Sequence, residues 1–197
     1  MLMVAKIPTV GTYYNVNLQS MRAPSMEKTW SYKDYCGGSN CYTDSGTSGI
    51  WLVMPKLDCE FFRNASREEL DGPLQIDLES TDGGTITLSF PLQWIVEQAA
   101  QGRVSFVDPT GDGGHFALGF PTYQFYYLVY GMGEDTVTFV DLPQKNESGR
   151  ELAEVDGGNF PAWVCGRDTP SANAARDHSL TFVSVASSLL LIAFISV

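Results

Sequence analysis

The chain has 197 residues, of which 44% are hydrophobic, so it is long enough for one ordinary domain with a substantial core, with or without tails. Its formal net charge is −11. Because no Lys/Arg cluster could neutralise nucleic-acid phosphates, we expect no nucleic-acid partner. The 19 glycines and the frequent turn residues favour many short strands over long helices.

The first predicted element is a strand near the N-terminus. In the segment from Thr12 to Met21, apolar and polar residues alternate after Tyr13, and this pattern is typical of a half-buried strand. The residues before it, Met1 to Pro8, form too short an apolar stretch for a signal peptide, and proline interrupts it early. Since the C-terminal end of the chain points to the secretory pathway, we expect an upstream part of the protein that this chain lacks.

The chain contains four cysteines, Cys36, Cys41, Cys59 and Cys165. The spacing of the first two suits a small disulfide-closed loop between two strands. A zinc site would need a second ligand pair, and the only histidines, His115 and His178, do not have ligand spacing. We therefore predict a Cys36–Cys41 disulfide, no metal and no cofactor. The other two cysteines could pair with each other or with cysteines outside this chain.

The next feature is the run Asp44-Ser45-Gly46-Thr47-Ser48, followed by an apolar segment at 49–54 and by Pro55. Glycine lets the backbone turn sharply and brings its N–H group close to the acid. The hydroxyl groups can donate hydrogen bonds to the carboxylate oxygens. The run is therefore suited to holding one carboxylate still. The alternative is an ordinary surface turn, since all of these residue types favour turns.

The remaining elements follow from apolar periodicity and turn residues. They are a buried segment at 50–54, a short helix at 56–70, a strand at 85–90 ended by Pro91, an apolar aromatic segment at 116–129 interrupted at Gly119, and a strand at 136–140. A turn at 131–135 joins the last two of these. The pattern predicts a mostly β protein with one or two short helices.

The C-terminal third differs in composition. The apolar pattern fades over residues 143–179, which we interpret as a linker or stalk. Residues 180–197 are uncharged, but 18 residues barely span a bilayer and no basic tail follows them. Small residues at 171–175 and a polar spacer at 176–179 make this end similar to a GPI-attachment signal. A retained membrane helix and a buried globular helix are the alternatives.

Two sequons for N-linked glycosylation occur, at Asn64 and at Asn146. Together with the cysteines they indicate the secretory pathway. With the hydrophobic end of the chain, they predict a protein at the cell surface or on an internal membrane, anchored through its C-terminal tail.

These segments, in this order, resemble the C-terminal lobe of pepsin-like aspartic proteases, including the membrane-anchored type. The segments that carry the resemblance are 12–18, the small loop at 36–41, 44–48, 86–91, 118–130 and 137–140. Three positions depart from the family's pattern: Phe120 and Gly131 each stand where Asp is usual, and Pro55 follows Asp44 by eleven residues where nine is common.

The resemblance implies one lobe of the bilobal acid-protease fold at residues 1–142, then the linker at 143–179 and the hydrophobic segment at 180–197. It also implies peptide hydrolysis by two aspartates that share a proton, because two carboxylates so close together cannot both ionise. Asp44 would be one of the two. Gly46 and Thr47 would hydrogen-bond its carboxylate, Ser45 would brace the motif against the other lobe, and Ser48 would support the turn.

The first aspartate motif is not found in the chain. Four Asp-Gly pairs lack the hydroxyl residue and are interpreted as turns: Asp71-Gly72, Asp82-Gly83, Asp112-Gly113 and Asp156-Gly157. A serine mechanism using Ser45 and His115 is disfavoured, because nothing around Ser45 looks like Gly-x-Ser-x-Gly.

Two functions stay open. One is an aspartic endopeptidase acting on a peptide or protein substrate and completed by a missing N-terminal lobe or by a second copy of the chain. The other is a catalytically inactive surface module used for binding or structure.

Overall fold

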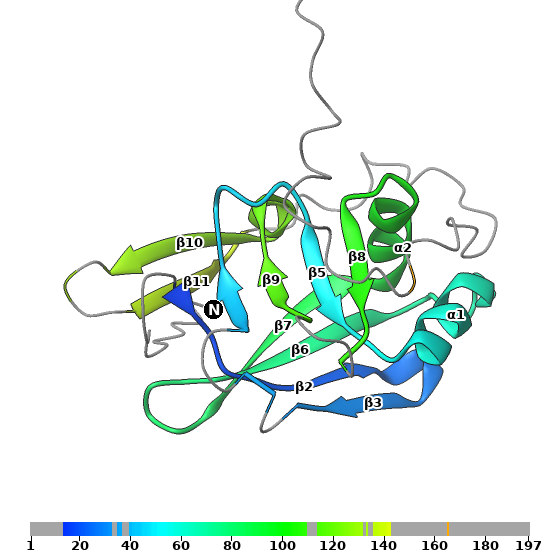
Figure 1. Cartoon of the computed structure of the whole chain (residues 1–197), viewed down its shortest axis with the longest axis horizontal. Coiled ribbons are helices and arrows are strands. Elements are labelled where there is room, and N and C mark those ends of the chain that lie inside the picture. Colours follow the sequence, from blue (N-terminus) through cyan, green and yellow to red (C-terminus); the bar gives the residue numbers. More distant parts are fainter. Residues whose placement is uncertain are drawn as a thin grey trace, which may run out of the picture.

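The computed structural model describes residues 14–32, 35–36, 40–109, 114–131, 133, 136–142 and 165. Within this part of the chain the protein is mostly β, as the sequence predicts, with two short α-helices. In Figure 1 a four-stranded sheet lies along the bottom of the view, a five-stranded sheet stands above it, and a two-stranded hairpin lies at the left. The candidate site lies in the five-stranded sheet.

The four-stranded sheet is antiparallel throughout and has the order β3-β2-β6-β7. Its strands are β2 (Leu18–Ala23), β3 (Lys28–Ser31), β6 (Pro73–Glu79) and β7 (Thr85–Pro91). Side chains on β7 alternate between buried positions, such as Leu88 and Phe90, and more exposed ones, such as Ser89. This period of two confirms the strand predicted at 85–90 and turns one apolar face toward the core.

The five-stranded sheet has the order β1-β4-β9-β5-β8. Its strands are β1 (Tyr14–Asn15), β4 (Cys41–Thr43), β5 (Ile50–Val53), β8 (Val104–Val107) and β9 (Phe116–Leu118). Strand β9 runs parallel to β4 and antiparallel to β5, so it lies between two strands that are close neighbours in the sequence. The expected N-terminal strand is divided, since β1 and β2 belong to different sheets.

The hairpin consists of β10 (Tyr126–Gly131) and β11 (Thr136–Asp141), paired antiparallel from Tyr126–Asp141 to Gly131–Thr136. It confirms the predicted strand at 136–140 and its antiparallel neighbour. Two 3-10 helices, η1 (Pro24–Met26) and η2 (Phe120–Gln124), complete the elements. The apolar segment at 116–129 is therefore three elements, because β9 ends at Leu118, just before Gly119, and η2 precedes β10.

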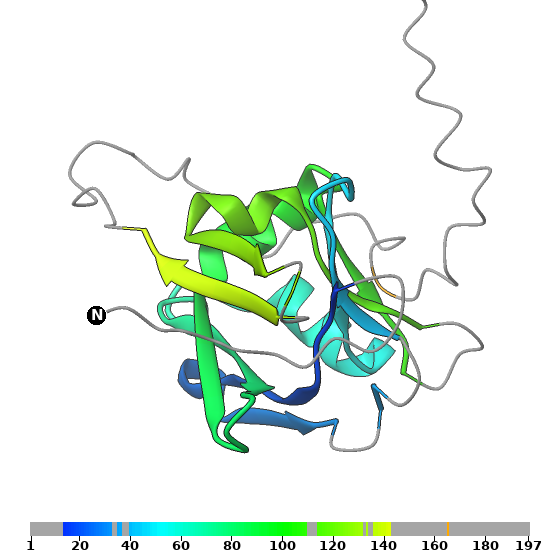
Figure 2. The same ribbon diagram turned by 90° about the vertical axis from the view of Figure 1, so that its left-hand side faces the viewer.

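Helices α1 (Lys56–Asn64) and α2 (Leu92–Ala100) each pack against strands of both the four-stranded and the five-stranded sheet. Phe62 of α1 contacts Trp30 of β3 and Phe106 of β8, with ring centroids 5.8 and 6.0 Å apart. This one buried ring joins the two larger sheets, and Figure 2 shows α1 at their junction. On α2, Trp94 packs against Phe90 and Phe125 in a second aromatic group.

The predicted helix at 56–70 is too long, because α1 ends at Asn64. Ala65 has extended backbone, with ψ 141°. Ser66 then begins a separate turn, in which its N–H and hydroxyl groups donate to a carboxylate oxygen of Glu69 at 2.7 and 2.8 Å. The Glu69 N–H group donates back to the Ser66 hydroxyl at 3.3 Å. This reciprocal pair is a capping box, which starts a turn and competes with continuation of the helix.

The cysteines form two disulfides, Cys36–Cys41 and Cys59–Cys165. The first confirms the predicted small loop, and the second settles the pairing that the sequence left open. Apart from Cys165, the linker at 143–179, including Asn146, and the hydrophobic segment at 180–197 lie outside the described residues. None of the helices that the structure describes is long and apolar enough to cross a membrane.

Candidate active site

The five residues from Asp44 to Ser48 form the loop between β4 and β5. The backbone N–H of Asp44 donates to the carbonyl of Leu118 at 3.2 Å, which ties the start of the loop to β9. The backbone N–H of Thr47 donates to the carbonyl of Asp44 at 3.2 Å and closes the turn. Ile50 then pairs with the same Leu118 from the other side. The loop therefore arches over the end of β9.

Gly119 lies under this arch. A Cβ atom at this position would collide with the carbonyl oxygens of Gly49 and Thr47, so the loop packs directly on the glycine backbone. The N–H of Phe120 donates to the carbonyl of Thr47 at 2.8 Å and fixes the contact. Any larger side chain at 119 would push the loop away.

Both carboxylate oxygens of Asp44 accept hydrogen bonds from within the loop. The N–H of Gly46 donates to Oδ1 at 2.8 Å, and the hydroxyl of Thr47 donates to Oδ2 at 2.7 Å. Asp44 is half-buried, and each oxygen of its carboxylate is held by one donor from its own loop. These are the two contacts predicted from the sequence pattern for Gly46 and Thr47.

Three tyrosines lie beside the loop, and the sequence pattern did not single them out as site residues. The hydroxyls of Tyr130 and Tyr123 are 2.8 Å apart, and the rings of Tyr130 and Tyr14 have centroids 4.4 Å apart. Burial raises the pKa of Tyr130; the hydrogen bond to Tyr123 and the negative charge of Asp44 raise it further, against a lowering by the Thr43 hydrogen bond. Tyr130 therefore keeps its proton and can act as a donor next to Thr43 and Asp44.

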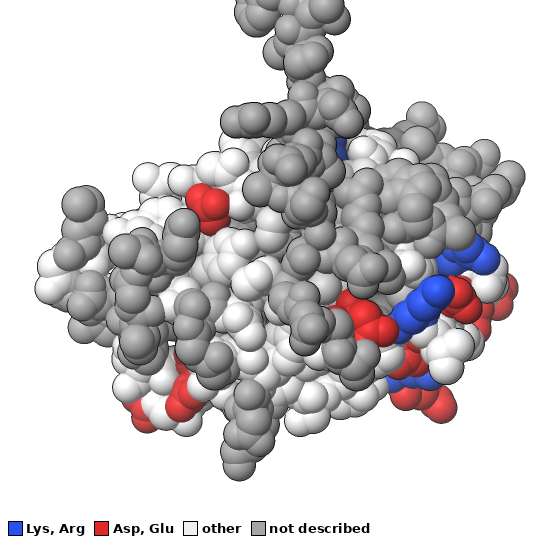
Figure 3. All heavy atoms as spheres, in the orientation of Figure 1, with Lys and Arg blue, Asp and Glu red and all other residues white. Residues whose placement is uncertain are grey.

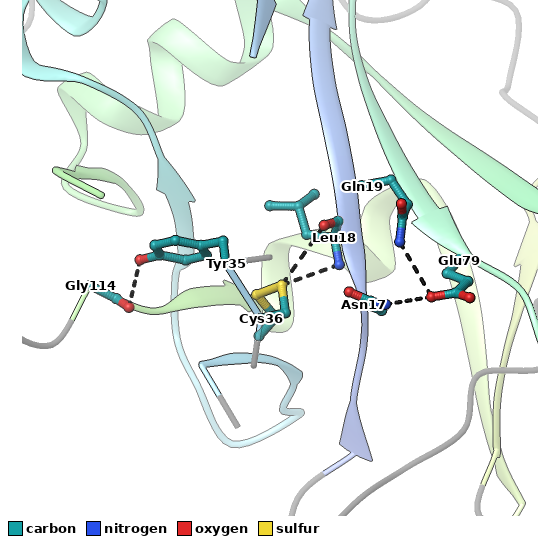
Figure 4. The surroundings of a disulfide bond; sticks show 8 residues. Asn17, Leu18, Gln19, Tyr35, Cys36, Glu79 and Gly114 are labelled. Carbon is teal, nitrogen blue, oxygen red and sulfur yellow. Dashed lines mark hydrogen bonds between the residues drawn. A yellow bond between two sulfur atoms is a disulfide. The ribbon is translucent and has the colours of Figure 1, made fainter. Parts of the chain in front are cut away.

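The Cys36–Cys41 disulfide lies at the other end of β4. The N–H of Leu18 donates to Sγ of Cys36 at 3.2 Å, and the hydroxyl of Tyr35 donates to the carbonyl of Gly114 at 2.6 Å (Figure 4). The start of β2, residues 35–36 and the approach to β9 are thus fastened together. The disulfide and these hydrogen bonds fix the position of the start of β4. Because Asp44 follows β4, they also help to fix the position of Asp44.

Ser45 and Ser48 are exposed at the loop surface. His115 precedes β9, and the parallel register pairs Cys41 with Phe116. His115 therefore lies beside the start of β4, whereas Ser45 lies beyond its end, about 16 Å away at roughly 3.3 Å per residue. The two residues therefore lie at opposite ends of β4, and the structure does not bring them together as a nucleophile–base pair would require.

Exposed apolar side chains occur next to the loop, at Phe120, and on β10. Phe120, in contact with Thr47 through its backbone, is 63% exposed. Tyr127 and Val129 are 59% and 45% exposed, and they alternate on β10 with the buried Tyr126 and Leu128. One face of β10 therefore packs on the core, and the other presents apolar surface to solvent. Exposed apolar surface of this kind is typical of a contact with another protein segment.

The described part of the chain contains no group of three or more His, Cys, Asp or Glu side chains placed to hold a metal ion. Asp71-Gly72 and Asp82-Gly83 lie in a bend and a turn, as predicted, while Asp112-Gly113 and Asp156-Gly157 lie outside the described residues. No family model matches the chain, and no curated protein sequence matches it.

Proposed function

We propose that the chain is the C-terminal lobe of a pepsin-like aspartic endopeptidase, anchored to a membrane of the secretory pathway, in which Asp44 is one of two catalytic carboxylates. The observation that carries the proposal is the arrangement of Asp44 over β9. A strand inserted between β4 and β5 supports a loop whose carboxylate is held by Gly46 and Thr47. This presents one fixed carboxylate at the surface of a rigid sheet.

In this mechanism the second aspartate comes from outside the chain. The two carboxylates share one proton, and the pair titrates as a unit. The ionised member takes a proton from a water molecule, whose oxygen attacks the carbonyl carbon of the scissile peptide bond. The protonated member donates its proton to the carbonyl oxygen. Collapse of the tetrahedral intermediate then breaks the C–N bond, and the leaving nitrogen receives a proton from the dyad.

The exposed apolar face of β10 and Phe120 support a partner at this position. The partner is either an N-terminal lobe or a second copy of the chain related by a two-fold axis. In either case its docking would bury the apolar surface and bring a second carboxylate to Asp44. The two disulfides support folding in an oxidising compartment, consistent with secretion.

A second candidate is a catalytically inactive surface module. Phe120 favours it, because an exposed aromatic ring stands beside the loop where the protease family usually has Asp. In that case the face around Asp44 binds another protein without hydrolysing it.

The test is acid-pH cleavage of a quenched peptide library, with and without pepstatin. The chain is assayed alone over a range of concentrations and together with any polypeptide encoded in frame upstream. Activity that rises with the square of concentration identifies a homodimer, and activity that needs the upstream polypeptide identifies a separate lobe. Asp44→Asn should abolish cleavage, and Asp71→Asn, the same change at an exposed turn, should preserve it. Equal pepstatin-sensitive activity in both variants refutes the proposal, and inactivity under every condition favours the binding module.

A further inference from the structure

Helix α1 presents an apolar stripe to solvent. Leu57 is 80% exposed and Phe61 is 40% exposed, whereas Cys59 and Phe62 on the same helix are buried. Residues four apart lie on the same side of a helix, so the two exposed side chains are neighbours. Asn64 follows Phe61 by three residues and Leu57 by seven, and it is also exposed. All three residues therefore share one face of α1.

The side chain of Asn64 lies back along this face. Its Nδ2 atom donates to the carbonyl of Glu60 at 2.9 Å, in the turn that contains Phe61. This direction is general, since helical side chains lean toward the N-terminus of their helix. An amide nitrogen carries two hydrogens, and the bond to Glu60 uses one of them. A group attached to Nδ2 would therefore start its path over Phe61 and Leu57.

The surroundings of Phe61 are fixed by neighbouring charges. The ammonium group of Lys28 lies 5.1 Å from the centroid of the Phe61 ring and 3.0 Å from a carboxylate oxygen of Asp58. The indole N–H of Trp30 donates to the other oxygen of Asp58 at 2.9 Å. Lys28 covers one face of the ring, and the exposed part of Phe61 is held in place.

Charged side chains of both signs gather around this stripe. In Figure 3 the Lys and Arg side chains visible on this face lie mainly over α1 and its surroundings, with acidic side chains among them. The apolar surface is only two side chains long and has a charged border. It is therefore too small for a stable protein interface, and it suits a ligand with an apolar face and a polar rim. Sugars have this character, because their C–H bonds form apolar faces and their hydroxyls remain in water.

We propose that Asn64 is N-glycosylated and that the first sugars of its glycan lie along Phe61 and Leu57. The sequon is Asn64-Ala65-Ser66. The proposal rests on passage through the secretory pathway and is independent of protease activity.

In the transfer step, Nδ2 of Asn64 attacks the anomeric carbon of an oligosaccharide carried on a lipid diphosphate. An N–C bond forms, the C–O bond to the diphosphate breaks, the amide loses one proton and the lipid diphosphate leaves. In the folded protein the Ser66 hydroxyl is engaged by Glu69, so we expect transfer before this turn forms.

The first experiment measures occupancy. The full chain, directed into the endoplasmic reticulum by an added signal sequence, is mapped by mass spectrometry before and after enzymatic release of N-glycans. We expect a glycan on Asn64, its loss in Asn64→Gln, and its retention in Ser66→Thr, which keeps both the sequon and the hydroxyl bonded to Glu69. Asn146→Gln is the matched control and should leave Asn64 occupied. An unmodified Asn64 in the secreted chain overturns the proposal, whatever the state of the protease test.

The second experiment measures the contact with α1. The glycosylated protein is compared with Asn64→Gln by thermal unfolding and by amide hydrogen exchange. Loss of the glycan should lower the unfolding midpoint by about 2–4 °C, the shift expected for a contact of ordinary strength in a domain of this size, and should speed exchange in α1. In a Leu57→Ser, Phe61→Ser background the same comparison should give almost no shift. An equal shift in both backgrounds refutes the packing of sugars on the stripe.

Discussion

The hydroxyl of Thr47 donates to Oδ2 of Asp44 across 2.7 Å, while the N–H of Gly46 holds Oδ1. The first prediction follows from this pair. Under the proposed mechanism, Thr47→Val removes a hydrogen bond to a charged group, worth about 1.5–3 kcal/mol, and should lower kcat/KM by roughly ten- to a hundredfold. Thr47→Ser keeps the hydroxyl and should stay near the parent value. Steady-state kinetics of the assembled enzyme measure both, and a Thr47→Val variant as active as Thr47→Ser would show that the hydroxyl bond to Asp44 does not contribute.

The second prediction concerns Gly119, on which the Asp44 loop packs. Gly119→Ala places a Cβ against two carbonyl oxygens of the loop and should destabilise the protein by about 3 kcal/mol, because neither backbone segment can move without breaking its hydrogen bonds. Gly133→Ala is the control, since nothing lies within 4 Å of a Cβ there. Its effect should stay within about 0.5 kcal/mol. Urea denaturation measures both, and similar stabilities would mean that the loop does not press on Gly119.

The third prediction concerns pH and the buried carboxylate of Asp77. Burial raises its pKa, but hydrogen bonds from Arg22, Ser20 and Thr87 outweigh burial and lower the pKa below its ordinary value. A lowered folded-state pKa stabilises the protein above the unfolded value, about 3.9, and this stabilisation is lost as the pH falls through the folded-state pKa.

Asp77→Asn should therefore cost about 2–4 kcal/mol at neutral pH and should flatten the loss of stability in acid. Unfolding free energies measured from neutral pH down into acid test this, with Asp71→Asn as the exposed control. An unchanged acid limb in Asp77→Asn would assign the pH dependence to other carboxyl groups.

The fourth prediction compares the two disulfides. The Cys59–Cys165 bridge closes a loop with a sequence separation of 106, whereas Cys36–Cys41 has a separation of 5. By loop-closure entropy the long bridge is worth about 5 kcal/mol and the short one about 2 kcal/mol. Cys59→Ala with Cys165→Ala should accordingly destabilise the protein more than Cys36→Ala with Cys41→Ala. Chemical denaturation should also show a larger m-value for the first double variant, because its unfolded chain is less compact. The reverse order of stabilities contradicts the prediction.

Some elements that were not predicted carry readable signals. In β6, Leu74, Ile76 and Leu78 alternate with polar residues, and this period of two is visible in the sequence. Only the burial departs from it, because the polar Asp77 is buried as well. In α2, Leu92, Ile95, Val96 and Ala99 have helical spacing. By contrast, β8 is buried at every position and has no period, so its sequence does not distinguish a strand from a buried helix.

The sequence by itself determined the features whose interactions are local. The hydrogen bonds of Gly46 and Thr47 to Asp44 span two and three residues, and the Cys36–Cys41 loop spans five, so residue type and spacing are enough to predict them. The end of α1 is also set by a local interaction, the capping box between Ser66 and Glu69. The apolar periodicity at 56–70 hid this signal, so the predicted helix was too long.

Only the tertiary structure decided what lies next to the Asp44 loop. Strand β9 comes more than sixty residues after the loop in sequence, yet it inserts between β4 and β5 and places Gly119 beneath Thr47. The disulfide between Cys59 and Cys165 and the contact of Tyr130 with Thr43 also join residues that are even farther apart in the sequence. Such contacts depend on how separate segments bury one another, and residue spacing within any one segment does not encode that choice.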